Sequence, residues 1–327
     1  MSVTLWRKSI AIFIVLSLAV VVTASADEEV LYDIDGYVGG SLVMVLDDLP
    51  EGLGNISRPW AVATASDGRI YVLDSKDRVL IFSPEGEFIK AFGKNGRRAG
   101  EFREASALTI DRDDRVFVAD SGNSRIQVFD HDGNYLYDIG EAPPRRGEAG
   151  PGQLKRVISL AISPDDLVYA VDIDAHRVHV FNLDGEFQFA FGEKGTGDGQ
   201  LHFPVGIGFD PDGYVYVVNA LNFRMEVFSP DGEFDYKFGR AGDTVGTFSR
   251  PKTIAFDLDG NLYVTDSMLN LIQILDWEGE YLGRIGGHSE TPLFSQPFGI
   301  WIDANDTLFV ADRGNDRIMV FDLFALD

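Results

Sequence analysis

A pattern of short strands and tight turns repeats along almost the whole chain. Its clearest copy, residues 118–133, predicts the end of one strand, a polar loop, a second strand and a turn. One loop position returns at steps of 46 to 52 residues, at Asp74, Asp120, Asp172, Asn219, Asp266 and Asp312. The first residue of the next strand returns with it, at Arg78, Arg125, Arg177, Arg224, Leu271 and Arg317. A fixed period of this length, built from short strands, is typical of a β-propeller or a repeat array.

Each copy carries four strand signals separated by turn residues. In the fourth copy, the first two strand signals are separated by Pro211-Asp212-Gly213. This segment predicts a tight turn, because proline fixes φ and glycine accepts a positive φ. The four strand candidates of this copy are residues 206–210, 214–218, 224–228 and 233–238. Repetition of such a unit predicts an all-β fold in which each copy forms one four-stranded blade.

The two ends of the repeat region complement each other. The sixth copy stops at residue 327, before a fourth strand, whereas a strand candidate at residues 41–49 precedes the first copy. Pairing these ends would close a ring and remove exposed sheet edges. The sequence therefore predicts a six-bladed β-propeller over residues 41–327, with the N-terminal strand completing the last blade.

The segment before the propeller has the organisation of an export signal. Arg7 and Lys8 precede an apolar run at residues 10–22, and Ala24-Ser25-Ala26 supplies a small-residue cleavage site. A membrane span needs about 20 apolar residues, more than this run provides. We therefore interpret residues 1–26 as a signal peptide and residues 27–40 as an acidic leader. The expected location is secreted or periplasmic, with an uncleaved membrane anchor as the alternative.

Charge and cysteine content exclude several classes of function. The formal net charge is −24, and so acidic a chain repels the phosphate backbone of a nucleic acid. Cysteine is absent, which removes disulfides, thiolate metal sites and a cysteine nucleophile. We expect no nucleic-acid partner and no membrane partner beyond export, and we expect a monomer.

The repeats resemble those of the NHL-repeat family of six-bladed β-propellers. The resemblance is carried by residues 118–129, 204–213 and 309–318, and extends from about residue 41 to the end of the chain. Proteins similar in this way serve as interaction platforms, RNA-binding domains, sensor domains of bacterial kinases, or lyases that cleave peptidyl-hydroxyglycine. Since one fold hosts all of these, the fold does not choose among them.

The lyase alternative is tested by the residues that its zinc site needs. Residues 172–176, which end in His176, resemble the first ligand segment of those lyases. At the comparable later positions this chain has Lys252 and Phe298, and residues 219–222 hold no tyrosine. No cofactor is therefore identified. Two alternatives stay open. One is a divalent cation, Ca or Zn, bound in the central channel, and the other is a function as a metal-dependent lyase or lactonase-like hydrolase.

Irregular loops are the better guide to function. The recurring Asp and Arg side chains are interpreted as blade structure, because nearly every copy has them. Departures from the loop pattern fall in copies three to five, near a longer link at residues 141–154. Since loops on a rigid scaffold vary without unfolding it, we predict a non-catalytic platform that binds a protein, peptide or other ligand there. The candidate residues are Asp174, His176, Asn222, Phe223, Met268 and Leu269.

Overall fold

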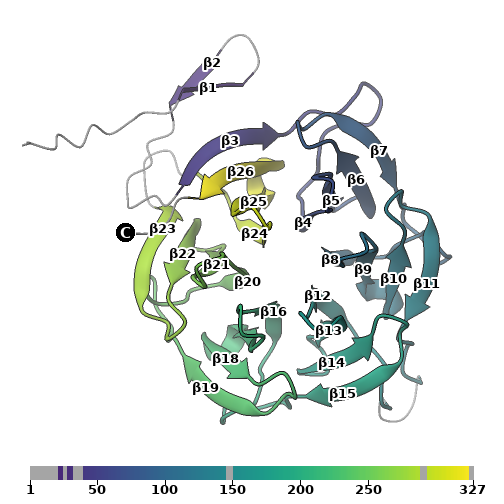
Figure 1. The fold of residues 1–327 in the computed structure, drawn as a ribbon, viewed down its shortest axis with the longest axis vertical. Coiled ribbons are helices and arrows are strands. Elements are labelled where there is room, and N and C mark those ends of the chain that lie inside the picture. The colour runs from purple at the N-terminus through teal and green to yellow at the C-terminus, as the bar shows by residue number, and fades with distance from the viewer. Residues whose placement is uncertain (1–20, 25–27, 32–39, 145–149, 288–292, 324–327) are drawn as a thin grey trace, which may run out of the picture.

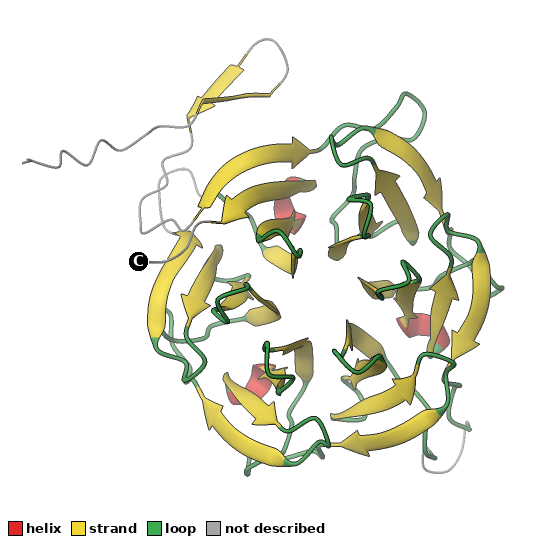
Figure 2. Cartoon of the chain, in the orientation of Figure 1, coloured by secondary structure: helices red, strands yellow, loops and turns green. Residues whose placement is uncertain are grey.

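Six four-stranded antiparallel sheets surround a central axis in this computed structural model (Figure 1). The structure describes residues 21–24, 28–31, 40–144, 150–287 and 293–323. Strands and loops make up almost all of this part of the chain (Figure 2). Within it, the helices are three 3-10 turns, Ser121–Asn123, Ala220–Asn222 and Arg313–Asn315, and no helix is long and apolar enough to cross a membrane. The predicted all-β propeller is confirmed.

The blades follow one another in sequence, and each begins with the strand nearest the axis. Blade 1 contains β4 (Ala61–Thr64), β5 (Ile70–Asp74), β6 (Arg78–Phe82) and β7 (Phe88–Phe92). Blade 2 contains β8 (Ala105–Ile110), β9 (Val116–Asp120), β10 (Arg125–Phe129) and β11 (Tyr135–Ile139). Blade 3 contains β12 (Val157–Ile162), β13 (Leu167–Asp172), β14 (Arg177–Asn182) and β15 (Phe187–Phe191).

The second half of the ring has the same order. Blade 4 contains β16 (Pro204–Phe209), β17 (Val215–Asn219), β18 (Arg224–Phe228) and β19 (Phe234–Phe238). Blade 5 contains β20 (Pro251–Phe256), β21 (Leu262–Asp266), β22 (Leu271–Leu275) and β23 (Tyr281–Gly286). Blade 6 contains β24 (Pro297–Ile302), β25 (Thr307–Asp312), β26 (Arg317–Leu323) and β3 (Gly40–Leu46).

Ring closure follows the predicted pairing of the two ends. Strand β3 pairs antiparallel with β26, with Leu42 opposite Phe321 and Leu46 opposite Ile318. Leu42 and Leu46 are each 5% exposed, so this outer strand contributes to the core as well as completing the sheet. The predicted closure is confirmed.

Little of the predicted signal peptide and leader falls within the described residues. Val21–Ala24 forms β1, which pairs antiparallel with β2, Glu28–Leu31. The proposed cleavage site ends outside the described part, since Ser25 and Ala26 are not described. Export and cleavage stay predictions.

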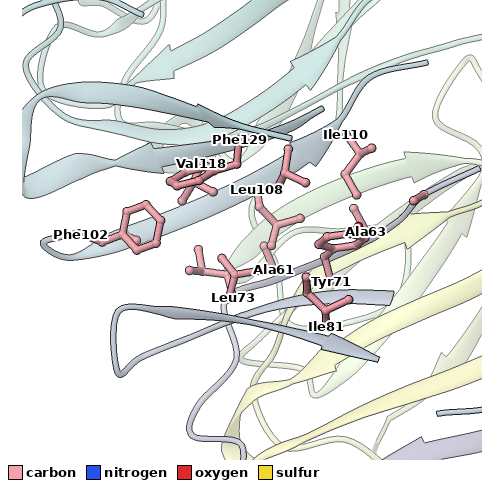
Figure 3. Packing of buried hydrophobic residues seen from close by; sticks show 14 residues of the cluster. Ala61, Ala63, Tyr71, Leu73, Ile81, Phe102, Leu108, Ile110, Val118 and Phe129 are labelled. Atoms are coloured by element: carbon pink, nitrogen blue, oxygen red, sulfur yellow. The ribbon is translucent and has the colours of Figure 1, made fainter. Parts of the chain in front are cut away.

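The core lies between neighbouring blades. The second and third strands of a blade are buried along nearly their whole length, whereas fourth strands such as β7 alternate between half-buried and exposed side chains. In Figure 3, side chains from blades 1 and 2, among them Tyr71, Ile81, Leu108 and Phe129, pack into one cluster. Each blade thus buries its faces against its two neighbours, which explains why the repeats form a single closed domain.

The Phe-Gly pair after the fourth strand has a packing role. Gly93 follows β7 with φ at +86°, and a Cβ there would come within 2.7 Å of Phe102 Cδ2. Phe102 is fully buried in the link to blade 2, and Leu154, Leu201, Phe248 and Phe294 fill the corresponding place in later links. A glycine is needed because the chain turns with positive φ directly beside this buried side chain.

Candidate functional site

The propeller has two faces with different loops. We call the face with the loops between second and third strands, and the links between blades, the connection face. The face with the loops between first and second and between third and fourth strands is the turn face. All six predicted site residues belong to the connection face, in the loops of blades 3, 4 and 5.

Nearly all of the net negative charge lies on the turn face. Its described loops carry 23 Asp or Glu side chains and only three basic ones, Arg69, Arg112 and Arg115. The described loops of the connection face carry 12 acidic and 12 basic side chains. The turn-face loops are residues 65–69, 83–87, 111–115, 130–134, 163–166, 183–186, 210–214, 229–233, 257–261, 276–280 and 303–306. An anionic ligand therefore meets less repulsion on the connection face.

A cavity of about 590 Å³ occupies the central channel. Inner strands of all six blades line it, mainly through apolar side chains such as Leu160, Ile254 and Trp301. Its turn-face end includes the carboxylates of Asp111, Asp210 and Asp257. A pocket of this size and apolar lining is typical of small-ligand sites.

The carboxylates at that end serve their own hairpins. Asp210 Oδ1 accepts a 2.8 Å hydrogen bond from the Tyr214 N–H, and Asp257 Oδ1 accepts one of 2.7 Å from the Asn261 N–H. Burial raises the pKa of both carboxyls. Throughout the described ranges, no group of three or more His, Asp or Glu side chains is arranged to hold a metal ion. These segments are turns, as their Asp-Xaa-Asp-Gly sequences predict.

The recurring Asp and Arg form blade-to-link contacts. Asp74 Oδ2 accepts a 3.0 Å hydrogen bond from Arg78 Nε and one of 3.3 Å from the Ser57 N–H. Arg78 Nη1 in turn donates to the Leu53 carbonyl at 2.9 Å. Equivalent Arg–Asp pairs occur in blades 2 and 6, with N–O distances of 2.8 Å. In blades 1, 2 and 6 the repeated pair thus has the structural role that the sequence predicts.

The last residue of each loop between second and third strands is left-handed. Its φ lies between +53° and +58° at Asp77, Ser124, His176, Phe223, Asn270 and Asp316. Small polar side chains tolerate this conformation, whereas bulky ones rarely adopt it. Phe223 is therefore the unusual side chain in this set, because its backbone has the same conformation as the others and histidine, like asparagine and aspartate, is enriched in it.

His176 joins blade 3 to blade 4. Its Nδ1 accepts a 3.1 Å hydrogen bond from the Phe203 N–H, as Asn270 and Asp316 accept from the links that follow their blades. Burial lowers the pKa of His176, which keeps Nδ1 an acceptor at neutral pH. The rings of His202 and Phe203 lie 5.9 and 4.9 Å from that of His176. This histidine thus has a structural contact in the described fold.

The other predicted site residues fall into two groups. Asp174 is exposed, and Met268 is 51% exposed at the tip of its loop. Asn222 donates to the Gly195 carbonyl at 2.9 Å, Phe223 is half-buried, and Leu269 is only 4% exposed. Leu269 differs from the expected exposed loop-tip side chain, because its loop turns it into the core while Met268 points outward.

Four exposed apolar side chains lie in connection-face loops of blades 4 and 5 or in the links that enter these blades. Leu221 is 49% exposed and Met268 51%, each in the loop between second and third strands. Phe203 and Val245, from the links that enter blades 4 and 5, are 37% and 39% exposed. Sequence analysis missed Phe203 and Val245, although both follow the Gly-rich start of a link and depart from its polar composition. Exposed apolar residues grouped on one face are typical of an interaction site.

Comparison with known proteins agrees with this architecture. Residues 55–139 match the family described as "6-bladed beta-propeller". The human E3 ubiquitin-protein ligase NHLRC1 is 29% identical over 135 residues, which cover 41% of this chain and 31% of that protein. Human NHL repeat-containing protein 3 is 35% identical over 78 residues, covering 23% and 22%. Protein brain tumor of Drosophila melanogaster is 27% identical over 101 residues, covering 31% and 10%. The chain thus spans about a third or less of these relatives.

Solved structures share the fold over most of their length. Virginiamycin B lyase from Staphylococcus aureus superposes with a TM-score of 0.59 at 14% identity, covering 86% of this chain and 99% of that one. A streptogramin B lyase gives 0.58 at 13% identity, covering 88% and 98%. At such identities the likeness establishes the fold alone. The chain is a six-bladed β-propeller. Segments of it are similar to NHL repeat proteins, and the predicted resemblance to the NHL-repeat family is confirmed.

Proposed function

We propose that this propeller is a non-catalytic binding module that holds a protein or peptide partner on its connection face. The observation that carries the proposal is the group of exposed apolar side chains over blades 4 and 5, Phe203, Leu221, Val245 and Met268. They stand on short loops fixed by buried strands, so a partner can bury them without reorganising the scaffold. A partner segment with complementary apolar side chains fits this surface.

A metal-dependent lyase or hydrolase in the central channel is the less favoured function. The fold is shared with virginiamycin B lyase. Yet Lys252 and Phe298 occupy the inner-strand positions at which the sequence comparison calls for metal ligands, and His176 Nδ1 is engaged by the Phe203 N–H. A cation would therefore need a ligand set other than the one those lyases use.

Export would place this surface outside the cytoplasm. The sequence of residues 1–26 supports a cleaved signal peptide. Intact mass of the exported protein is expected to correspond to a chain that begins at Asp27. A mature protein that retains residues 1–26 would favour the membrane-anchored alternative.

The test compares apolar side chains on the two faces. We expect the Leu221→Ser/Met268→Ser variant to lose partners captured by the wild-type protein from the native extracellular fraction. The matched control is Leu258→Ser/Trp277→Ser on the turn face, where the two side chains are 66% and 57% exposed. Capture should survive in the control, and neither variant should melt earlier, because all four side chains are largely exposed.

Two results would overturn the proposal. One is equal capture by both double variants and the wild type. The other is a specific turnover that His176→Ala abolishes while the protein stays folded, since that would establish chemistry at the channel. Leu269→Ala is a reference for loss of stability alone. Removing this buried side chain should lower stability by about 2–4 kcal/mol and should leave the exposed apolar side chains in place.

A further inference from the structure

Four basic side chains meet around the connection-face end of the channel. Lys252 is the second residue of β20, and Arg313 lies in the 3-10 turn between β25 and β26. Arg250 and Arg58 precede the inner strands of blades 5 and 1. Burial and the positive charges of Arg250 and Arg313, opposed by Asp266, together lower the pKa of Lys252 to about 8. The cations are therefore close enough to repel one another.

Two aromatic rings support this cluster. Arg313 Cζ lies 4.0 Å from the centre of the Trp60 ring, and Lys252 Nζ lies 5.6 Å from that of Phe298. The two rings meet edge to face with their centres 4.8 Å apart. Each cation thus rests on one ring of a contacting aromatic pair, a favourable arrangement that keeps its other side available.

Close packing of three inner strands fixes these positions. Thr253 Oγ1 donates a 2.6 Å hydrogen bond to the Phe298 carbonyl, which joins β20 to β24. Gly299 permits β24 to approach the backbone of Trp60 and Ala61 at the start of β4. The cluster is therefore assembled by blades 5, 6 and 1 and exists only when the ring is closed.

The cluster has no counter-ion among the described residues. Among the described residues, no carboxylate lies within ion-pair distance of Lys252 Nζ or of the Arg313 guanidinium. The recurring Arg78, Arg125, Arg224 and Arg317 contrast with them, since each pairs with an Asp or Glu. Arg313 Nε is buried and has no hydrogen-bond partner. A cation withdrawn from water without a partner is unfavourable.

The nearest acidic groups are already engaged. Asp266 accepts hydrogen bonds from the Ser249 and Arg250 N–H groups at 2.8 and 3.0 Å. Asp316 accepts one of 2.6 Å from the Arg58 N–H. Their oxygens hold the links between blades, and an external anion would supply the negative charge that the described residues do not offer to Arg313 and Lys252.

We propose that Trp60, Lys252, Phe298 and Arg313 form a binding site for the carboxylate group of a ligand. The Arg313 guanidinium, stacked on Trp60, presents its two Nη groups in one plane, which matches the two oxygens of a carboxylate. Lys252 adds a second positive charge beside it. The aromatic rings exclude water and strengthen these interactions, and they give the carbon atoms next to the carboxylate an apolar contact. This site does not rest on the protein partner proposed for blades 4 and 5.

The carboxylate can come from a free organic acid or from the C-terminus of a peptide. Four probes separate these sources: hexanoate, inorganic phosphate, and acetyl-Leu-Phe with either a free carboxylate or a terminal amide. Calorimetry with the purified full chain at pH 7 should show binding of at least one carboxylate probe. Tighter binding of hexanoate indicates a free acid, and tighter binding of the peptide acid indicates a C-terminus. Binding of the peptide amide as tight as the acid would overturn the proposal.

Variants locate the binding within the cluster. We expect Lys252→Met and Arg313→Met each to weaken binding of the carboxylate probe at least tenfold. Lys194→Met is the matched control, because Lys194 is an exposed lysine in a link of the same face. Its affinity should equal that of the wild type. Lys252→Met should also melt no earlier than the wild type, since methionine retains the contact with Phe298 without the desolvated charge.

The pH dependence separates a binding role of Lys252 from a structural one. Affinity for the carboxylate should fall between pH 7 and pH 9.5 as Lys252 loses its proton; Arg250, Arg313 and Asp266 are the other charged groups that face Lys252. Lys252→Met should lose this pH dependence. Undetectable binding of both carboxylate probes, phosphate binding as tight as theirs, or affinity unchanged in Lys252→Met would overturn the proposal.

Discussion

Asn219 Nδ2 donates a 3.2 Å hydrogen bond to Glu226 Oε1 in blade 4, and this pair reverses the chemistry of blade 2. In blade 2 the amide belongs to Gln127 and the carboxylate to Asp120, at 3.0 Å. Both arrangements satisfy the same groups. The amide donates to a carbonyl of the link, that of Gln200 in blade 4 and of Glu101 in blade 2. The carboxylate accepts from the Arg that begins the third strand, Arg224 or Arg125. Blade 4 thus lacks the usual Asp at position 219, and Glu226, seven residues later, supplies the missing carboxylate.

Exchanging the two groups should restore what either single change destroys. We expect Asn219→Asp to place two buried carboxylates in contact and to destabilise the fold by about 2–3 kcal/mol. Glu226→Gln should destabilise by a similar amount, because it leaves Arg224 without its buried carboxylate. The double variant should recover most of this loss, because it recreates the arrangement of blade 2.

Chemical denaturation of the four proteins measures the coupling between the two positions. A recovery of about 1–3 kcal/mol relative to the sum of the single changes is expected for groups in one hydrogen-bond network. If the double variant loses the sum of the two single-variant stability losses, Glu226 does not compensate for Asn219. Asn222→Ala offers a comparison in the same blade, since Asn222 contacts the Gly195 carbonyl and neither member of the pair.

Repetition explains which parts of the structure the sequence could predict. The Asp and Arg positions mark the same strand ends in successive copies, so the blades follow from the period alone. The closing strand follows from counting strands, because the last copy lacks one and β3 precedes the first. These conclusions need only local sequence and the requirement that every sheet edge be paired.

The candidate site depends on relationships that no single repeat contains. Met268 and Leu269 are neighbours in sequence, yet loop geometry exposes one and buries the other. Trp60 and Arg313 meet because ring closure brings blade 1 beside blade 6. Lys252 was visible in the sequence only as a departure from a metal-ligand pattern. That no described carboxylate pairs with it becomes evident from the packing of three blades.

His179 occupies the position of Gln127 and Gln273 without making their contacts. It is 3% exposed, and neither ring nitrogen has a hydrogen-bond partner. In blades 2 and 5 the glutamine Oε1 accepts from a glycine N–H of the link, at 2.9 and 2.6 Å. We expect His179→Gln to gain the equivalent bonds in blade 3 and to raise stability by about 1 kcal/mol.

The stability gained by His179→Gln should increase as the pH falls. Burial lowers the pKa of His179 in the folded protein, so the unfolded chain binds its proton at higher pH than the folded one. Stability contributed by the neutral ring is therefore present above pH 6.5 and is lost as pH falls through the folded pKa. Melting curves from pH 8 to pH 5 should drop less steeply for His179→Gln. Parallel curves would show that His179 is not responsible.

Loss of β3 should open the ring. A chain lacking residues 1–46 leaves β26 as an unpaired edge and removes the buried side chains of Leu42 and Leu46. We expect it to melt well below the wild type and to aggregate, because an exposed edge pairs with other chains and each leucine contributes about 1.5–3 kcal/mol. The matched control lacks only residues 1–39 and retains β3. Equal melting and solubility of the two truncations would contradict closure by this strand.

The approach of β24 to β4 can be tested without deleting a strand. A Cβ at Gly299 would overlap the Trp60 carbonyl oxygen and lie 2.8 Å from Ala61 Cα, so the backbone of blade 1 would have to move. We therefore expect Gly299→Ala to destabilise the propeller by about 1–3 kcal/mol, in the range of other overpacking changes. Gly150→Ala is the control, because a Cβ there meets its nearest neighbour, Gln153 Oε1, at an ordinary 3.5 Å. Denaturation midpoints compare the two variants, and the fluorescence of Trp60 and Trp301 reports whether the blade 6–blade 1 contact has shifted. If both glycine variants unfold together with the wild type, blades 6 and 1 have room to separate, and their close approach does not hold the ring shut.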